Sequence, residues 1–300
     1  MTAESFHPAL DKIGVRRSFN TSTETYDRAS ALQKYAGKQL LERLEMMKTK
    51  PLRILDLGSG TGLFSRELAR MYARARIIQL DIADRMLMTS RRHDPRFFSR
   101  HSYVCADGEH LPLAPAAIDL VYSNLMLQWS QDPDRLFREL SVALRPEGLL
   151  VFATLGPDTL RELRDSWAAV DDQIHVHTFI DMHDLGDALI RAGFSDPVME
   201  VEMVTLSYSN LSALVNDLKG LGATNINRDR RRTLTGKSRY LQMEAEYEKR
   251  RNNGMLPASH ELIYGHAWLA DHAGRVHHAE SGQVSISLEQ IRQLLKKPIV

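Results

Sequence analysis

Three aspartates and a run of glycines are the residues of this 300-residue chain whose types and spacing best suit ligand chemistry. Asp56 lies two residues before the loop Gly58-Ser59-Gly60-Thr61-Gly62, and Asp81 and Asp107 follow two later apolar runs. Glycines accept positive φ and let a ligand approach the backbone with no Cβ in the way. The spacing G-x-G-x-G differs from the dinucleotide pattern G-x-G-x-x-G, and a carboxylate beside the loop disfavours a pyrophosphate. The loop therefore favours a phosphate-free ligand that carries an ammonium and a sulfonium group.

Each later aspartate has a predicted role that follows from its place after an apolar run. Asp81 is expected to accept hydrogen bonds from both hydroxyls of a ribose, as acids at this place do in dinucleotide folds. Asp107 is expected to accept a hydrogen bond from the exocyclic amine of an adenine. A single aspartate of this kind is explained equally well as a helix N-cap, worth about 0.5–2 kcal/mol. Three in succession favour a ligand site.

The elements that must position these residues are the strands and helices of a predicted α/β fold. Nearly continuous apolar runs alternate with helical patterns, which is typical of a parallel sheet covered by helices on both faces. Two later runs, 198–208 and 261–268, are predicted to add strands, so we expect a doubly wound, Rossmann-like and mostly parallel sheet of seven strands. The five earlier runs are 53–57, 76–81, 102–106, 118–123 and 148–154.

The region before the sheet is predicted to supply a lid. The first 25 residues or so look irregular, and a helix is expected from Tyr26 to about Met47, with Ser22 or Thr23 as its N-cap. Tyr26 and Gln33 would face inward from this helix, so that it can fold over the loop.

Composition limits the class of protein. Lys and Arg (39) nearly balance Asp and Glu (38), a net charge of +1, which argues against a general binder of nucleic acid or membrane surfaces. The single cysteine, Cys105, excludes an internal disulfide. No histidine shows the spacing H-E-x-x-H, so no metal site is expected. With no secretory core and no apolar run approaching about 20 residues, we expect a cytoplasmic protein.

The constellation from Leu52 to Thr154 resembles the class I S-adenosylmethionine-dependent methyltransferases. Their pattern is met by the glycine loop, by Asp81, by Asp107-Gly108-Glu109 and by the turn Leu144–Gly148, in which Glu147 stands where many members have glycine. The resemblance implies S-adenosyl-L-methionine as cofactor. The expected cofactor-binding residues are Tyr26, Gln33, Asp56, Gly58, Ser59, Gly60, Gly62, Asp81, Ile82, Met86, Asp107, Gly108, Glu109, Asn124 and Gln128.

Further blocks, spread over most of the chain, resemble the malonyl-acyl-carrier-protein O-methyltransferases of biotin synthesis. They are 26–29, 123–129, 155–160, 181–187, 217–225 and 264–268. The resemblance implies methyl transfer to the free carboxyl of a malonyl thioester on acyl carrier protein. A related mitochondrial arginine hydroxylase that assists respiratory complex I assembly shares parts of the pattern. An S-adenosylmethionine-binding assembly factor, a hydroxylase acting on a protein side chain and a silent binding module therefore remain as alternatives.

The implied reaction does not require a group that removes a proton from the substrate, because a carboxylate is already ionised at pH 7. We therefore expect no general base and no catalytic residue of the conventional kind. An anionic acyl group and an acidic carrier favour basic partners, and the stretch Arg228–Arg251 holds nine basic and four acidic side chains. A solvated helical face is the better explanation of any single one of these arginines, and the hypothesis is that at least one of the basic residues contacts substrate or carrier. The candidates for substrate or carrier contact are Tyr26, Trp129, Lys219, Asn225, Arg228, Arg230, Arg231 and Arg232.

The expected organisation has three regions. Residues 1–50 form the N-terminal segment and lid helix, and residues 51–270 form the methyltransferase domain with a helical insertion at about 209–255. Residues 271–300 form a polar C-terminal tail, which is longer than the resemblance leads us to expect.

Overall fold

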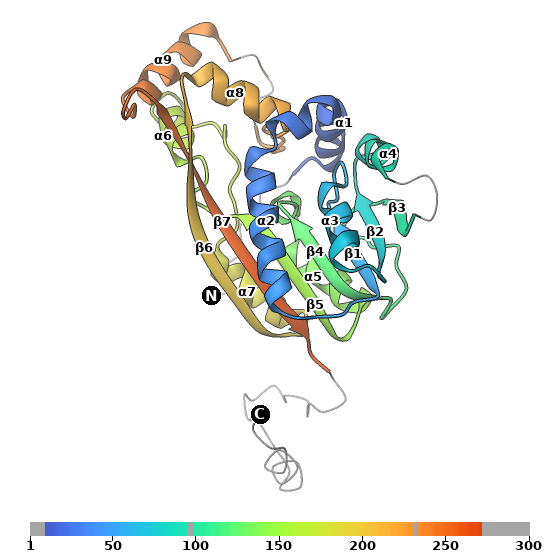
Figure 1. Cartoon of the computed structure of the whole chain (residues 1–300). Helices are drawn as coiled ribbons and strands as arrows, with labels where there is room; N and C mark the ends of the chain where they lie inside the picture. Colours follow the sequence, from blue (N-terminus) through green and yellow to red (C-terminus); the bar gives the residue numbers. More distant parts are fainter. Residues whose placement is uncertain (1–9, 95–98, 231–232, 234, 272–300) are drawn as a thin grey trace, which may run out of the picture.

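In the computed structural model, which describes residues 10–94, 99–230, 233 and 235–271, seven strands form one sheet (Figure 1). The strand order is β3-β2-β1-β4-β5-β7-β6, in which β7 runs antiparallel to β5 and β6 and the other neighbouring strands are parallel. The predicted doubly wound, Rossmann-like fold is therefore confirmed. The strands are β1 (Arg53–Leu57), β2 (Arg76–Asp81), β3 (His101–Cys105), β4 (Ile118–Asn124), β5 (Leu144–Leu155), β6 (Phe194–Tyr208) and β7 (Leu256–Leu269).

The central strands are largely apolar because both faces of the sheet are covered. Neighbouring residues of a strand point to opposite faces. Ile54 accordingly packs into one buried cluster and Leu55 into another. The helices α2 (Ala31–Met46) and α3 (Leu63–Met71) supply the first cluster, and α5 (Pro133–Ala143) and α7 (Met182–Arg191) supply the second. The helix α4 (Asp84–His93) packs against β2 and β3.

The N-terminal region differs from the prediction. Residues expected to be irregular form the helix α1 (Lys12–Ala29), and Ser30 separates it from α2. The predicted N-cap at Ser22 or Thr23 is therefore wrong, because both hydroxyls lie inside α1 and donate to the carbonyl of Phe19. The N-cap is Asp11, whose carboxylate accepts from the backbone N–H of Gly14 at 3.1 Å.

Three further helices pack together at one end of the sheet. They are α6 (Arg161–Ala168), α8 (Leu211–Gly220) and α9 (Lys237–Glu248), and they share a buried cluster that includes Tyr247. The helices α8 and α9 lie between β6 and β7 in the chain, within the predicted insertion. The boundaries of the three predicted regions stay a prediction, and the tail beyond Asp271 lies outside the described residues.

The helix α1 lies across the end of the sheet and is held there by α8 (Figure 1). The hydroxyls of Ser18 and Thr25 donate to the carbonyls of Gly222 and Gly220, both at 2.8 Å. Among the described residues, the helices lack the length and apolar character needed to cross a bilayer.

Candidate active site

A cavity of about 630 Å³ opens at the carboxyl ends of the central parallel strands, and we call it the strand-end cavity. Parallel α/β sheets bind ligands at this edge, because the loops that follow the strands meet there. Residues from β1, β2, β4, η1 (Leu127–Trp129) and α1 all contribute to its wall. Of the predicted cofactor-binding residues, those that line it are Tyr26, Gly58, Gly60, Asp81, Ile82, Met86, Asp107, Gly108 and Asn124.

The glycine loop divides into an open half and a packed half. Gly60 has φ of +53°, and a Cβ added there would meet nothing closer than the Tyr26 ring at 3.8 Å. Gly62 has φ of +74°, but a Cβ there would overlap the hydroxyl of Ser90. Gly60 therefore leaves room for a ligand, whereas Gly62 allows the loop to pack on α4 and does not line any of the cavities described in this section.

Asp81 joins the glycine loop to the end of β2. One carboxylate oxygen accepts from the N–H of Gly60 and the other from the N–H of Ala83, both at 2.8 Å. Burial raises the pKa of Asp81 to about 6, although these backbone hydrogen bonds oppose the shift. The group is mostly ionised at neutral pH and lies at the wall of the strand-end cavity.

Asp56 is buried more deeply, at 2% exposure, and accepts a hydrogen bond from Ser65. Burial, with a smaller contribution from the charge of Asp81, raises the pKa of Asp56 to about 7. It lines a smaller cavity of about 390 Å³ beside the glycine loop, together with Gln33 and Ser59. A cation bound near these two carboxylates would favour their ionised forms.

The residues after β3 form an ion cluster with α1. Lys12 Nζ lies 3.0 Å from a carboxylate oxygen of Asp107 and 3.0 Å from one of Glu109. The same Glu109 oxygen accepts from the Ser130 hydroxyl at 2.8 Å and from the N–H of Gln131 at 2.5 Å. Glu109 therefore joins the segment after β3 to the segment after η1 through hydrogen bonds, and it does not line the strand-end cavity. Lys12 and Asp107 do line this cavity.

Sequence reasoning missed Lys12, because the region that carries it was expected to be irregular.

A second cavity, of about 870 Å³, lies next to the first, and we call it the neighbouring cavity. Phe19, Tyr26 and Trp129 line both cavities. Phe19 packs edge-on against Tyr26 and Trp129, with ring centroids 6.4 and 5.2 Å apart. Burial, reinforced by nearby carboxylates, raises the pKa of Tyr26 far above its ordinary value, so its hydroxyl stays protonated. This row of rings separates the two cavities.

The neighbouring cavity receives several of the other predicted residues. Gln33, Gln128, Trp129 and Asn225 line it. The side chains of Gln128 and Asn225 also hold the backbone, since each amide nitrogen donates to a carbonyl, Leu125 at 2.8 Å and Ile174 at 2.5 Å respectively.

The predicted basic residues lie elsewhere. Lys219, Arg228 and Arg230 line neither the strand-end nor the neighbouring cavity, and Arg231 and Arg232 lie outside the described residues. Three histidines of this wall, His175, His177 and His260, were not predicted. The segment 175–179 has neither helical nor strand periodicity. Its content of histidine and aromatic residues was therefore the only signal by which the sequence could have indicated a site there.

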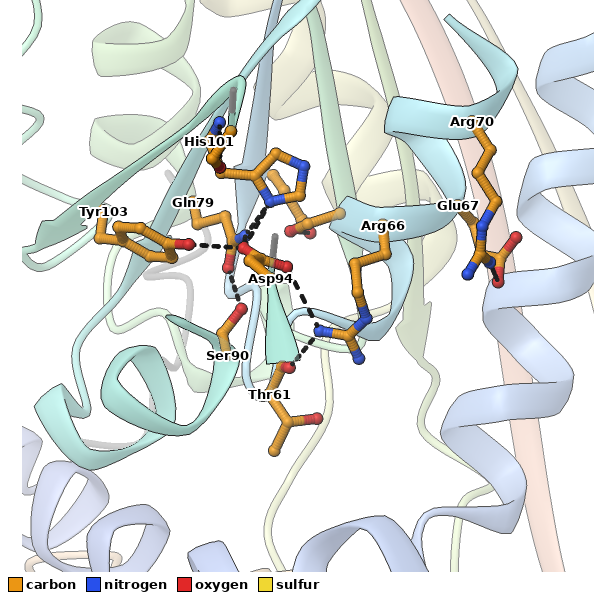
Figure 2. Close-up of polar contacts among 12 residues, drawn as sticks. Thr61, Arg66, Glu67, Arg70, Gln79, Ser90, Asp94, His101 and Tyr103 are labelled. Atoms are coloured by element: carbon orange, nitrogen blue, oxygen red, sulfur yellow. Dashed lines mark hydrogen bonds and ion pairs between the residues drawn. The ribbon is translucent and has the colours of Figure 1, made fainter. Parts of the chain in front are cut away.

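A buried polar network, which contacts the glycine loop through Arg66, holds this loop in place (Figure 2). Arg66 Nη1 donates to the carbonyl of Thr61 at 3.0 Å and lies 3.7 Å from the carboxylate of Asp94. The other Asp94 oxygen lies 2.6 Å from His101 Nδ1 and accepts from the hydroxyl of Tyr103 at 2.5 Å. The network therefore connects the loop with β3 through one buried carboxylate.

A second branch of this network reaches the packed glycine. Gln79 of β2 donates to Asp94 at 3.0 Å, and its side-chain oxygen accepts from Ser90 at 2.5 Å (Figure 2). Ser90 is the residue on which Gly62 packs. The conformation of the loop is thus tied to α4 and β2 as well as to β3.

The site has the properties that S-adenosylmethionine requires. The open glycine accommodates close approach of a ligand, and the two buried acids match positive charge without phosphate. Among the described residues, no group of three or more His, Cys, Asp or Glu side chains is arranged to hold a metal ion.

The fold and this site define a class I S-adenosylmethionine-dependent methyltransferase, and residues 55–152 match the family model described as a methyltransferase domain. Two comparisons with curated relatives narrow the assignment. The chain is 46% identical over 272 residues to a malonyl-[acyl-carrier protein] O-methyltransferase of Laribacter hongkongensis, covering 88% of this chain and 91% of the relative. It is 47% identical over 273 residues to the enzyme of that name from Methylovorus sp., covering 89% and 92%. The chain belongs to the malonyl-[acyl-carrier protein] O-methyltransferase family.

Solved structures agree at the level of the fold. The YcgJ protein of Bacillus subtilis superposes with a TM-score of 0.56 at 12% identity, over 77% of this chain and 98% of that protein. A methyltransferase-like protein of Bacillus halodurans gives the same TM-score at 13% identity, over 78% and 100%. Family membership favours a carboxyl methyltransferase over the hydroxylase, assembly-factor and silent-module alternatives.

Proposed function

We propose that this protein transfers the methyl group of S-adenosylmethionine to the free carboxyl group of a malonyl thioester on acyl carrier protein. The product is the malonyl methyl ester that primes biotin synthesis. The observation that carries the proposal, beside family membership, is the pair of cavities that meet at one row of aromatic rings. One cavity has Asp81 in its wall, which suits a cationic donor, and the other has mostly apolar walls suited to an acyl chain.

The donor would occupy the strand-end cavity. Asp81 and the open backbone at Gly60 would hold the ribose and the chain beyond it, and Asp107 would face the base. Asp56, Gln33 and Ser59 would bind the amino-acid end through the smaller cavity beside the loop. When bound, the donor supplies an electrophilic methyl: the carboxylate oxygen forms the new C–O bond, the S–C bond breaks with its electron pair kept by sulfur, and no proton moves.

The acyl group would occupy the neighbouring cavity. Its walls carry aliphatic side chains such as Leu32, Leu160 and Leu218, which exclude water from the nucleophile. Because the attacking carboxylate is ionised at neutral pH, these walls need to orient it rather than deprotonate it. Tyr26 and Trp129 border both cavities and would guide the carboxylate toward the methyl group.

The carrier would dock through the basic residues near α8. Lys219 and Arg228 are exposed, and Arg230 is partly exposed, beside the segment 221–225 that lines the neighbouring cavity. Acyl carrier proteins are acidic, so this positive charge would mainly raise the rate of association. We expect such a reaction to take place in the cytoplasm.

A direct assay tests the proposal. Methyl-labelled S-adenosylmethionine is incubated with the protein and malonyl-acyl carrier protein, and the label on the carrier is measured before and after mild base. The expected result is base-labile label on malonyl carrier and none on isovaleryl carrier, whose branched methyl groups replace the carboxylate. Stable label, or label on both carriers, would contradict a carboxyl ester product.

A further inference from the structure

We propose that the imidazole of His177 binds one oxygen of the substrate carboxylate and thereby selects acyl groups that end in a carboxylate. This inference rests on the proposed function and names a specificity-determining residue for it. The second carboxylate oxygen remains free to attack the methyl group.

The first observation is the place of His177 in the molecule. It lines the neighbouring cavity but not the strand-end cavity. Its ring meets the Trp129 ring edge-on, with centroids 5.6 Å apart, and Trp129 borders both cavities. His177 is therefore the first polar ring on the acyl side of the aromatic row, one side chain away from the donor cavity.

The second observation is an unpartnered atom. Nε2 of His177 faces the backbone, where the N–H of Ile226 approaches it at 3.5 Å, whereas the buried Nδ1 has no hydrogen-bond partner. In the tautomer in which Nε2 accepts from Ile226, Nδ1 carries the proton and is a donor without an acceptor. Leaving a buried donor unpaired costs about 1–3 kcal/mol. A carboxylate oxygen in the cavity would satisfy it.

The electrostatic surroundings are consistent with this role in the protonated form and in the neutral tautomer that carries its proton on Nδ1. Burial lowers the pKa of His177, the Thr224 carbonyl opposes that shift, and the charge of Arg230 adds to it. In the protonated form Nε2 would donate to the Thr224 carbonyl and Nδ1 would still present an N–H. The protonated imidazole and the neutral tautomer that carries its proton on Nδ1 therefore offer the same donor to the substrate.

The third observation concerns the other polar residues of this wall. None of the described residues that line the neighbouring cavity is a lysine or an arginine. His175 is paired with Asp171 at 2.7 Å and stacks on Trp167, and His260 Nδ1 lies 3.1 Å from the Ala258 carbonyl. Gln33 also has an unpartnered atom, but it is an oxygen and repels a carboxylate. Among the described residues that line this cavity, the imidazole of His177 is therefore the group that we assign to the anion.

The test combines a change in the protein with a change in the ligand. His177→Leu removes the donor, and isovaleryl carrier replaces the malonyl carboxylate with an apolar group of the same shape. Dissociation constants of both carriers are measured with S-adenosylhomocysteine bound. In the native protein we expect malonyl carrier to bind about 10- to 100-fold more tightly than isovaleryl carrier. In His177→Leu we expect that preference to fall below about threefold, with isovaleryl binding unchanged.

Two further variants keep the result interpretable. His177→Asn retains an N–H donor and should preserve part of the preference, which a purely steric role would not. His183→Leu removes a histidine that is exposed on α7, outside the neighbouring cavity, and should behave like the native protein.

Undiminished preference in His177→Leu, or equal loss of affinity for both carriers, would overturn the inference. If the native protein methylates malonyl carrier in either case, the proposed function stands and only the role of His177 fails. If the native protein does not methylate it, the proposed function fails.

Discussion

Asp56 and Asp81 are buried carboxylates whose pKa values are raised, to about 7 and about 6, because burial penalises their charged forms. A protein that keeps two such groups in one site sacrifices stability at neutral pH, since the ionised acids destabilise the folded state. The bound sulfonium and ammonium groups would offset that cost. The sequence predicted the acids and their partner ligand, but their raised pKa values depend on the surrounding burial, which the sequence does not display.

We therefore expect the affinity for S-adenosylmethionine to fall as pH is lowered. A cation prefers the ionised acids, and protons compete with it once pH drops through the raised pKa values, from about 7 downward. The dissociation constant, measured by calorimetry between about pH 8 and pH 5.5, should rise about 10-fold or more. Binding should also release protons near neutral pH. A dissociation constant independent of pH over this window would show that the protonation of these acids is not coupled to ligand binding.

Glu147 stands where many members of the family have glycine, and we expect this difference to change only the stability of the protein. It is exposed and has φ of +61°, in the left-handed region that glycine adopts without strain. Glu147→Gly should raise the free energy of unfolding by about 0.5–1 kcal/mol, as measured by urea denaturation. Glu147→Ala keeps the strain and should give no gain. A destabilised glycine variant would mean that the side chain makes a stabilising contact.

At the scale of elements, α1 is the part of the fold that sequence patterns did not reveal. Its middle is rich in Ser, Thr and Asn, which compete for backbone hydrogen bonds and weaken a helical prediction. Tertiary contacts compensate for this composition. Asn20 donates to Asp84 of α4 at 2.9 Å, and Ser18 donates to the segment after α8. The central strands, by contrast, were predictable because their apolar runs are buried on both faces, and β6 was predictable because its residues alternate.

The Asp94 network couples three elements to the glycine loop, so its loss should affect stability and ligand binding together (Figure 2). Asp94→Asn should lower the free energy of unfolding by about 2–4 kcal/mol, because it removes the buried charge opposite Arg66. The dissociation constant for S-adenosylmethionine should rise several-fold, since Arg66 also holds the carbonyl of Thr61.

The matched control is Glu67→Gln on the same helix as Arg66. Among the described residues Glu67 pairs with the exposed Arg70 alone, so the variant should stay within about 0.5 kcal/mol of the native protein. Equal effects of the two substitutions would argue against a special role for the buried network.

At the scale of the whole molecule, the two cavities differ in how far they could be predicted. The strand-end cavity follows from the topology, because parallel strands bring their carboxyl ends to one edge. The neighbouring cavity joins α1, η1, α8 and the segment 175–179, which are distant in the chain and carry no shared periodicity. Its histidines could be recognised only after the fold had brought them together.

The proposed carrier docking predicts a dependence on salt that belongs to the whole complex. The Michaelis constant for malonyl carrier should rise about 10-fold between about 50 and 300 mM salt, because screening weakens long-range attraction. The double substitution Arg228→Glu and Arg230→Glu should raise it at low salt and remove most of this dependence. Malonyl-pantetheine, which lacks the acidic carrier, serves as the control substrate and should show little response to salt. A salt dependence that survives the double substitution would place the docking surface elsewhere.

The most direct test of the account is the chemical position of the transferred methyl group. The protein, malonyl carrier and S-adenosylmethionine with a ¹³C-labelled methyl group are allowed to react, and the product is observed by NMR. We predict one new resonance from a methyl bonded to an ester oxygen, with unlabelled S-adenosylhomocysteine as the other product. A labelled methyl on carbon, nitrogen or sulfur, or none on the malonyl group, would contradict it.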